Sequence, residues 1–300
     1  MKFQGAFTAL VTPMKEDGAV DYEGFRRLID FQISEGIDGL VPLGTTGETS
    51  TLEEDEEERL IKIAVEEAKG RVPLIIGAGS NNTRDMVRYV KRAKDMGADA
   101  AMVVTPYYNK PNDDGLLSHF KAAGEIGIPI IVYNIASRTG LNIPTPLMKK
   151  IADIPNIAGV KESSGDLKQI CEVIDSIAAP RKTGGAYFSA ISGDDLFALP
   201  MMNLGGDGIV SVISNLVPAR VKALAKACFD KNQEEARKIH FELFPLTKAA
   251  FVETNPAPIK LAMNWAGLPA GPCRLPMGKL SKASEEILRT ALTGMGLSVK

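Results

Sequence analysis

Eight short apolar segments alternate with helical segments over the first 231 residues, and this alternation constrains the fold more than any other feature of the sequence. The predicted strands cover residues 6–11, 39–43, 73–77, 100–104, 129–133, 157–161, 190–193 and 208–212. The stretches between them predict helices at residues 22–34, 52–69, 83–96, 116–126, 146–154, 166–177, 194–204 and 218–231. Because a helix follows each strand, we expect right-handed crossovers and a parallel sheet.

The length of the repeat favours a barrel over an open sheet. Each strand and helix together take about 25–30 residues, as in a (β/α)8 TIM barrel, which is an α/β fold. The alternative is a doubly wound open sheet, which usually has fewer strands and a glycine-rich dinucleotide-binding turn after the first one. Here the first predicted strand is followed by Thr12, Pro13 and Met14. The sequence therefore predicts the barrel.

The remainder of the chain has a helical pattern without strands. Helices are predicted at residues 233–251, 255–266 and 282–295, and proline and glycine residues separate the last two. No low-complexity linker precedes this part. We therefore expect a barrel domain at residues 1–231 and a C-terminal helical region at residues 232–300.

Composition argues against several classes of protein. The net charge of −2 provides no basic surface for a nucleic acid backbone. The three cysteines, Cys171, Cys228 and Cys273, lie far apart without a C-x-x-C pair, which disfavours a zinc site and a disulfide framework. No apolar run approaches the roughly 20 residues that span a bilayer. We expect a reduced, cytoplasmic protein that binds neither nucleic acid nor membrane.

A lysine stands at the end of the sixth predicted strand, where the sequence reads Gly159-Val160-Lys161-Glu162. In parallel α/β folds the carboxyl ends of the strands carry the chemistry. An amine in apolar surroundings loses hydration, so its pKa falls from about 10.4 and the neutral form can attack a ketone. The alternative is an ordinary loop lysine that Glu162 neutralises.

Other polar residues follow neighbouring predicted strands. Tyr133 ends the fifth strand, where its phenol could act as a general acid or base beside Lys161. Arg138 follows a few residues later and offers a planar fork for a carboxylate. After the second strand, the hydroxyls of Thr45 and Thr46 could bind a carboxylate or relay a proton. Each has an ordinary alternative, since tyrosines also pack at barrel ends and loop residues are often solvated.

A run of six acidic residues at positions 53–58 begins the second predicted helix. Carboxylates suit the positive end of a helix dipole. We expect this run to be a solvated helix start.

Four segments together resemble the N-acetylneuraminate lyase superfamily of class I aldolases, and within it the dihydrodipicolinate synthase family: residues 44–48, 133–140, 159–166 and 255–260. The resemblance covers nearly the whole chain. It implies that Lys161 forms a Schiff base with pyruvate. It also implies a proton relay of Tyr133, Thr45 and Tyr108, with Tyr108 reaching in from a neighbouring subunit.

The same resemblance implies the substrate-binding residues. Thr46 would help to bind the pyruvate carboxylate, and Val210 would offer its backbone carbonyl near the imine. Arg138 would bind the carboxylate of L-aspartate 4-semialdehyde, and the segment Ser137-Arg138-Thr139-Gly140 favours this family over sialic acid lyases.

The implied reaction condenses pyruvate with L-aspartate 4-semialdehyde, the first committed step of diaminopimelate and lysine biosynthesis. It needs no metal or organic cofactor, because the protonated imine is itself the electron sink. The alternative is another pyruvate-dependent aldolase or lyase of the superfamily, of the N-acetylneuraminate lyase or 2-keto-3-deoxy sugar acid aldolase type. A barrel that binds a small acid without turnover is a third interpretation.

The resemblance also bears on regulation and assembly. Members of the family are often inhibited by lysine, and the matching positions here are Ser50, Glu57, Asn81, Asp85 and Tyr107. Family members are commonly homotetramers built as dimers of dimers, so we expect the same assembly. Two features differ from the family pattern: Ala136 stands where proline is usual, and residues 179–189 contain a few extra positions before the seventh strand.

Overall fold

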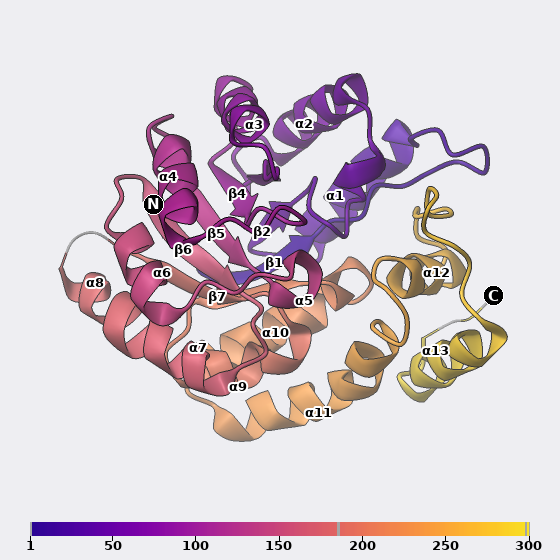
Figure 1. The fold of residues 1–300 in the computed structure, drawn as a ribbon. Helices are drawn as coiled ribbons and strands as arrows, with labels where there is room; N and C mark the ends of the chain where they lie inside the picture. The colour runs from indigo at the N-terminus through magenta and orange to yellow at the C-terminus, as the bar shows by residue number, and fades with distance from the viewer. Residues whose placement is uncertain (1, 185–186, 298, 300) are drawn as a thin grey trace. The chain divides into compact units, whose positions relative to one another are not determined.

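The computed structural model describes residues 2–184, 187–297 and 299. Over these residues, eight parallel strands alternate with helices in a (β/α)8 barrel, and further helices follow at the C-terminus (Figure 1). The prediction of the fold is confirmed. The chain divides into two compact units, Met1–Gly5 with Ile75–Val210 and Ala6–Leu74 with Ser211–Lys300, which we call the first and the second unit.

The first unit contains six neighbouring strands whose register sets up the candidate site. In order of pairing they are β3 (Ile75–Gly77), β4 (Ala100–Val104), β5 (Ile130–Asn134), β6 (Ile157–Glu162), β7 (Ser189–Ser192) and β8 (Gly208–Ser211). Register pairs Tyr133 with Lys161 and Asn134 with Glu162. The strands are short and largely buried, as expected when helices cover a parallel sheet.

Helices follow the strands of the first unit: α3 (Thr83–Asp95), α4 (Asp113–Gly124), α5 (Ala136–Thr139), α6 (Thr145–Ala152), α7 (Leu167–Val173), α8 (Ala179–Thr183) and α9 (Ala198–Asn203). Figure 1 shows α3, α4 and α6 outside the strands β4, β5 and β6. Their apolar faces, with Val90, Phe120 and Met148, pack in one core with Val132 and Val160 of the strands. This packing fixes the strands whose ends carry the candidate site.

Three helices of the first unit differ from the prediction. The helix expected at residues 166–177 is α7, which continues through a π-helical turn, Ile174–Ala178, into α8. The helix expected at residues 194–204 begins as a 3-10 turn, Asp195–Phe197. The short helix α5 was not predicted. Of the extra positions expected at residues 179–189, α8 accounts for Ala179–Thr183, whereas residues 185–186 lie outside the described residues.

The second unit contains the strands β1 (Gly5–Ala9) and β2 (Gly39–Val41), which pair in parallel. Its helices are α1 (Tyr22–Ser34), α2 (Glu54–Ala68), α10 (Pro218–Phe229), α11 (Gln233–Ala249), α12 (Ala257–Trp265) and α13 (Lys282–Gly294). Helix α1 packs on α2, α11 packs on α10 and α13, and α12 packs on α13. A domain division at residue 231 stays a prediction.

The acidic run at the start of α2 is less solvated than predicted. Glu53 and Glu56 form a capping box, which satisfies backbone N–H groups at the helix start. The Glu56 carboxylate also accepts two hydrogen bonds from Arg274, at 2.5 and 2.6 Å. Glu57 is 9% exposed and accepts from Thr49 Oγ1 at 2.8 Å. Only part of the run therefore faces solvent.

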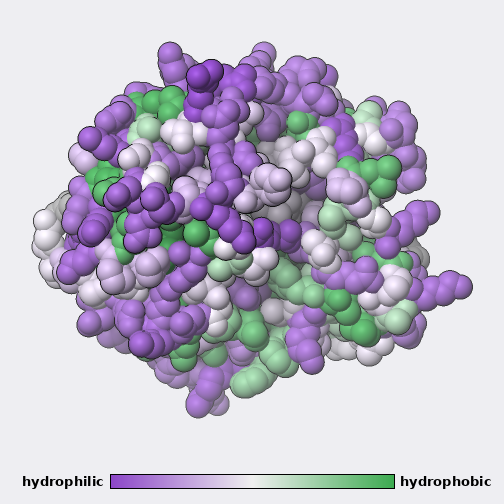
Figure 2. Space-filling model, viewed as in Figure 1, coloured by the Kyte–Doolittle hydropathy of each residue, from purple (hydrophilic) through white to green (hydrophobic). Residues whose placement is uncertain are grey.

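Hydrophilic residues spread over much of the face drawn in Figure 2, with smaller hydrophobic patches between them. Ten large apolar side chains are exposed among the described residues, Tyr108 the most at 90%. We find no helix in the described part of the chain whose length and hydropathy would allow it to span a membrane.

Candidate active site

Lys161 and Tyr133 meet at the carboxyl ends of β6 and β5. The two residues are register partners, and Lys161 Nζ lies 4.1 Å from the centre of the Tyr133 ring. Each is only 5% exposed. The structure therefore brings a buried amine and a buried phenol together, as their positions at the ends of neighbouring strands predicted.

Burial lowers the pKa of the Lys161 amine to about 7. Asp195 acts in the opposite direction and raises this pKa, whereas the positive charge of Arg138 lowers it further. Roughly half of the amine is neutral at pH 7, compared with about one part in a few thousand for an ordinary lysine. Lys161 can therefore act as a nucleophile at neutral pH.

The alternative interpretation of Lys161 as a loop lysine neutralised by Glu162 is wrong. Lys161 lies within β6, and consecutive side chains of a strand point to opposite faces. The buried Glu162 carboxylate accepts hydrogen bonds from Asn134 Nδ2 at 3.2 Å, Gln169 Nε2 at 3.2 Å and the Ser164 backbone N–H at 2.7 Å. This network ties β5 to β6 directly behind the Lys161–Tyr133 pair.

Burial raises the pKa of the Tyr133 phenol to about 12. Arg138 and a hydrogen-bonding interaction with Ser163 lower this pKa, and Asp194 raises it. The phenol is consequently protonated at neutral pH. It can donate a proton to an oxygen that leaves the carbon attacked by Lys161.

Arg138 is exposed on α5, which ends at Gly140 with a φ of +69° in the left-handed region. The Thr105 hydroxyl donates to Thr139 Oγ1 at 3.2 Å and anchors α5 against β4. Ala136, where the resemblance implies a proline, occupies the first position of this helix. Proline is common at that position, and α5 forms here without it.

Three other predicted residues of the first unit differ in exposure. Tyr108 is 90% exposed and has a φ of +71°, whereas the neighbouring Tyr107 is 40% exposed. Val210 lies near the end of β8 and is 2% exposed. The roles of Tyr108 and Val210 stay predictions.

Thr45 and Thr46 belong to the second unit, in the turn after β2. Thr46 Oγ1 accepts a hydrogen bond from Asn255 Nδ2 at 2.9 Å. Two residues later, Glu48 forms an ion pair with Lys260 at 2.6 Å, and both side chains are buried. The segments 44–48 and 255–260 are thus held together, while the predicted functions of Thr45 and Thr46 remain predictions.

The residues predicted for lysine inhibition are divided between the two units. Asn81, Asp85 and Tyr107 lie in the first unit, and Ser50 and Glu57 in the second. Within the first unit, Asn109 Nδ2 donates to the Asn81 carbonyl at 2.8 Å and links two of the loops concerned. The lysine site stays a prediction.

Gly193 and Ser163 contact the site, although neither was among the predicted site residues and a tight turn was the default interpretation of Gly193. A Cβ at Gly193 would lie 2.1 Å from Ser163 Oγ and 2.8 Å from Lys161 Cε, so only glycine leaves room for the lysine side chain. Strand periodicity offered a signal for Ser163, because it stands two residues after Lys161 and so points to the same face. Asp194 and Asp195 stand at the start of the helix predicted at residues 194–204, and nothing in that pattern indicated their effect on the site.

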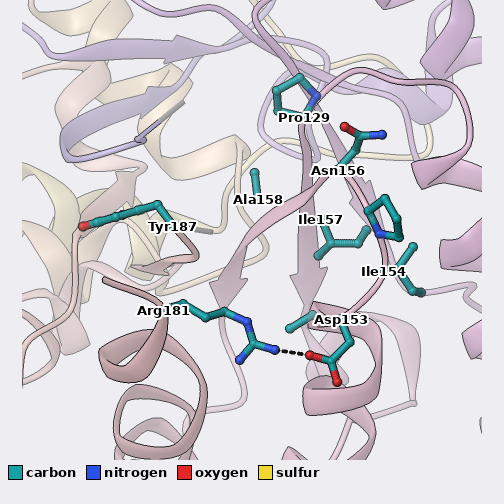
Figure 3. A pocket seen from close by; sticks show the side chains of 10 residues that line it. Pro129, Asp153, Ile154, Asn156, Ile157, Ala158, Arg181 and Tyr187 are labelled. Carbon is teal, nitrogen blue, oxygen red and sulfur yellow. Dashed lines mark hydrogen bonds and ion pairs between the residues drawn. The ribbon is translucent and has the colours of Figure 1, made fainter. Parts of the chain in front are cut away.

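A pocket of about 460 Å³ lies elsewhere in the first unit, at the amino ends of β5 and β6 (Figure 3). Pro129, Asn156, Tyr187 and the ion pair of Arg181 with Asp153 line it. It therefore lies at the opposite end of β6 from Lys161.

In the described part of the chain, no group of three or more His, Cys, Asp or Glu side chains is arranged to hold a metal ion.

Comparison with known proteins relates this geometry to a family. A family model described as "Dihydrodipicolinate synthetase family" matches residues 2–295. A protein of Nitratidesulfovibrio vulgaris (strain DSM 19637 / Miyazaki F), named 4-hydroxy-tetrahydrodipicolinate synthase, is 48% identical over 99% of this chain and 100% of its own length. A protein of Protochlamydia amoebophila (strain UWE25) with the same name is 47% identical over 97% of this chain and 96% of its own.

Solved structures of dihydrodipicolinate synthases also resemble this chain closely. Dihydrodipicolinate synthase from Aquifex aeolicus superimposes with a TM-score of 0.94 at 43% identity, covering 99% of this chain and 100% of that one. The enzyme from Cyanidioschyzon merolae, solved with lysine bound, gives a TM-score of 0.91 at 36% identity over 98% of this chain and 99% of that one.

Proposed function

Since the chain belongs to the dihydrodipicolinate synthetase family, we propose that it condenses pyruvate with L-aspartate 4-semialdehyde to 4-hydroxy-tetrahydrodipicolinate. The relatives that match it over its full length carry the name of that synthase. The protein is then a lyase with a class I aldolase mechanism in diaminopimelate and lysine biosynthesis. The observation that carries the proposal is the buried Lys161, whose pKa is lowered to about 7 beside Tyr133.

The reaction begins on Lys161. Its neutral amine attacks C2 of pyruvate to give a carbinolamine, which loses water as Tyr133 donates a proton to the departing oxygen. The resulting iminium loses a proton from C3 and becomes an enamine. The enamine carbon attacks the aldehyde, and the substrate amine then adds to the iminium and displaces Lys161 as the ring closes.

We assign the proton relay to Tyr133 with Thr45 and Tyr108. The support for Tyr133 is its distance of 4.1 Å, from ring centre to Lys161 Nζ. Thr45 and Tyr108 enter by their match to the family pattern. The 90% exposure of Tyr108 supports a function that a second subunit completes.

We assign substrate binding to Thr46, Arg138 and Val210. The carboxylate of pyruvate binds at Thr46, and the backbone carbonyl of Val210 faces the imine. Arg138 binds the carboxylate of L-aspartate 4-semialdehyde, which its guanidinium can hold through two parallel hydrogen bonds. Its effect on the pKa values of Lys161 and Tyr133 supports a position within electrostatic range of both.

The test of the proposed function compares aldehydes. We expect rapid pyruvate consumption with L-aspartate 4-semialdehyde and none with N-acetylmannosamine, and Lys161→Ala should abolish it. Lys168→Ala is the matched control, because Lys168 lies on the next helix with its side chain 84% exposed. Turnover of N-acetylmannosamine alone, with pyruvate still trapped on Lys161 by borohydride, would favour the alternative aldolase. Unchanged turnover in Lys161→Ala would exclude the mechanism.

We further propose a homotetramer, built as a dimer of dimers, in the cytoplasm. Exposed Tyr107 and Tyr108 support a contact between subunits at this loop. The cysteines are free thiols, which supports a reducing compartment. Sedimentation equilibrium measures the assembly directly, and a monomer at micromolar concentration would contradict the proposed tetramer.

Lysine inhibition at Ser50, Glu57, Asn81, Asp85 and Tyr107 is a separate proposal. Its support is the family pattern and the relative from Cyanidioschyzon merolae that was solved with lysine bound. A titration in which millimolar lysine leaves the rate unchanged would exclude it.

A further inference from the structure

The hydroxyl of Ser163 is a buried polar group without a hydrogen bond of ordinary geometry among the described residues. Ser163 directly follows β6, and its backbone N–H donates to the Asn134 carbonyl at 2.9 Å, which fixes the residue in place. A buried hydroxyl that lacks a partner costs about 1–3 kcal/mol. The fold therefore fixes Ser163 in place, while the hydrogen-bonding capacity of its hydroxyl is only partly used.

The hydroxyl lies among the reacting side chains. Ser163 Oγ is 2.1 Å, and Lys161 Cε 2.8 Å, from the same point, the position that a Cβ on residue 193 would take. Gly193 thus leaves one space that Ser163 and the end of Lys161 share. The Ser163 hydroxyl also has a hydrogen-bonding interaction with the Tyr133 phenol, which lowers the pKa of that phenol.

The reaction turns the Tyr133 oxygen into a stronger acceptor for this hydroxyl. In the resting protein the Tyr133 phenol is protonated, and a neutral phenol oxygen is a weak acceptor. Once Tyr133 has donated its proton to the departing carbinolamine oxygen, its own oxygen is a buried phenolate. Hydrogen bonds to an ionised acceptor are shorter and roughly twice as strong as neutral ones.

We propose that Ser163 is a positioning residue that donates a hydrogen bond to the Tyr133 oxygen when that oxygen has lost its proton during imine formation. The inference rests on the proposed function, since it assigns Tyr133 as the proton donor in that reaction. Ser163 acts through Tyr133 and transfers no proton to the substrate.

Other charged groups act on the same phenol, so the test has to separate them from Ser163. Arg138 favours the phenolate, Asp194 disfavours it, and Lys161 lies against the ring. All three are unchanged in a Ser163 variant. A change in the rate therefore reports the hydroxyl alone.

The experiment measures pyruvate imine formation on Lys161 by rapid mixing followed by borohydride quenching. In Ser163→Ala we expect the rate to fall about 10-fold, as for the loss of one hydrogen bond to a charged oxygen. The pyruvate concentration at half-saturation should change less than about 2-fold. The solvent deuterium isotope effect on imine formation should rise, because proton transfer becomes slower. Ser163→Thr, which keeps the hydroxyl, should restore the rate.

Stability supplies an independent readout. Removing a buried hydroxyl without a full partner should leave the thermal midpoint unchanged or raise it. Ser164→Ala is the matched control, because Ser164 Oγ accepts from the Asp166 N–H at 3.3 Å and only closes the loop. This control should form the imine at the unaltered rate.

Two outcomes overturn the inference. One is a normal rate of imine formation in Ser163→Ala. The other is a slow rate that Ser163→Thr does not restore and that accompanies a lowered thermal midpoint, which indicates a purely structural residue. Failure of the proposed function would look different, because the unaltered protein would then form no imine, or would form it and leave L-aspartate 4-semialdehyde unreacted.

Discussion

Lys161 Nζ lies 4.1 Å from the centre of the Tyr133 ring, at the ends of two paired parallel strands. Burial acts on both groups but in opposite directions, lowering the pKa of the amine to about 7 and raising that of the phenol to about 12. Between these values the amine is mainly neutral while the phenol keeps its proton. The nucleophile and the acid are therefore ready over the same range of pH.

The first prediction concerns Asp195, whose carboxylate raises the pKa of Lys161. In Asp195→Asn this effect is lost, so the pKa of Lys161 should fall below about 7. The acidic limb of kcat/KM for pyruvate should then move to lower pH. Asp175→Asn, at an exposed position after α7, is the control and should leave the limb in place. An unshifted limb in Asp195→Asn would show that Asp195 does not act on the amine.

The second prediction concerns Gly193. In Gly193→Ala the new Cβ would fall 2.1 Å from Ser163 Oγ and 2.8 Å from Lys161 Cε, so the lysine side chain has to move. A displacement of about 1 Å can cost 100-fold in rate, and we expect borohydride-trapped imine to form at least about 10-fold more slowly. Gly278→Ala is the control, since nothing lies within 4 Å of its Cβ position. Equal rates in both variants would contradict this account of Gly193.

The third prediction concerns the pH dependence of stability. His119 Nδ1 and Thr83 Oγ1 share a hydrogen bond of 2.9 Å, and burial lowers the pKa of His119 from 6.5 to about 4. The His119 imidazole thus takes up a proton near pH 6.5 in the unfolded chain, but only near pH 4 in the folded protein. The contribution of neutral His119 to the free energy of unfolding is fully present above pH 6.5. The free energy of unfolding should fall by on the order of 3 kcal/mol as the pH drops to 4.

Urea unfolding at pH 7.5 and pH 5 measures this loss. His119→Asn can keep a hydrogen bond to Thr83 and does not titrate, so its stability should depend less on pH. The comparison is made in a His240→Asn background, because burial also lowers the pKa of that histidine. Parallel pH profiles with and without His119 would refute the prediction.

The fourth prediction concerns the buried ion pair behind Thr46. Lys260 Nζ donates to Glu48 at 2.6 Å and also to the carbonyls of Thr12 and Pro272, at 3.0 and 2.7 Å. Lys260→Met leaves Glu48 buried without its cation, so unfolding should require about 3–5 kcal/mol less free energy.

Adding Glu48→Gln to Lys260→Met should recover part of that loss, because it removes the uncompensated charge. The control is Lys226→Met, which breaks an exposed pair with Asp230 and should cost at most about 0.5 kcal/mol. Glu48→Gln is also measured alone. If the effects of Lys260→Met and Glu48→Gln on the free energy of unfolding simply add in the double variant, the two side chains do not interact.

The fold was predictable because its signal is repeated along the chain. Burial between helices demands a short apolar run at every strand, and the predicted strand at 157–161 differs from β6 (Ile157–Glu162) by one residue. Lys161 and Tyr133 were predictable for a related reason. Neighbouring parallel strands end at the same edge of a sheet, so residues at their ends meet.

What the sequence did not predict depends on contacts between distant residues. Arg274 takes Glu56 out of solvent across 218 positions of sequence, and no local pattern links the two. The position of Glu162 next to Lys161 suggests a counter-ion, whereas its partners Asn134 and Gln169 come from other elements. Helical periodicity likewise does not reveal the π-helical turn, Ile174–Ala178, that continues α7.

The strand β6 places Lys161 on one face and Glu162 on the other, and this alternation limits how the gene for the protein can change. Deleting or inserting one codon before Lys161 would move the carboxylate toward Tyr133 and the amine toward the amides of Asn134 and Gln169. The lysine would then be out of reach of Tyr133, and the amides would lose their carboxylate acceptor. Over evolution we expect this strand to vary by substitution at constant length, while changes in length collect in the loops at the opposite end of the strands.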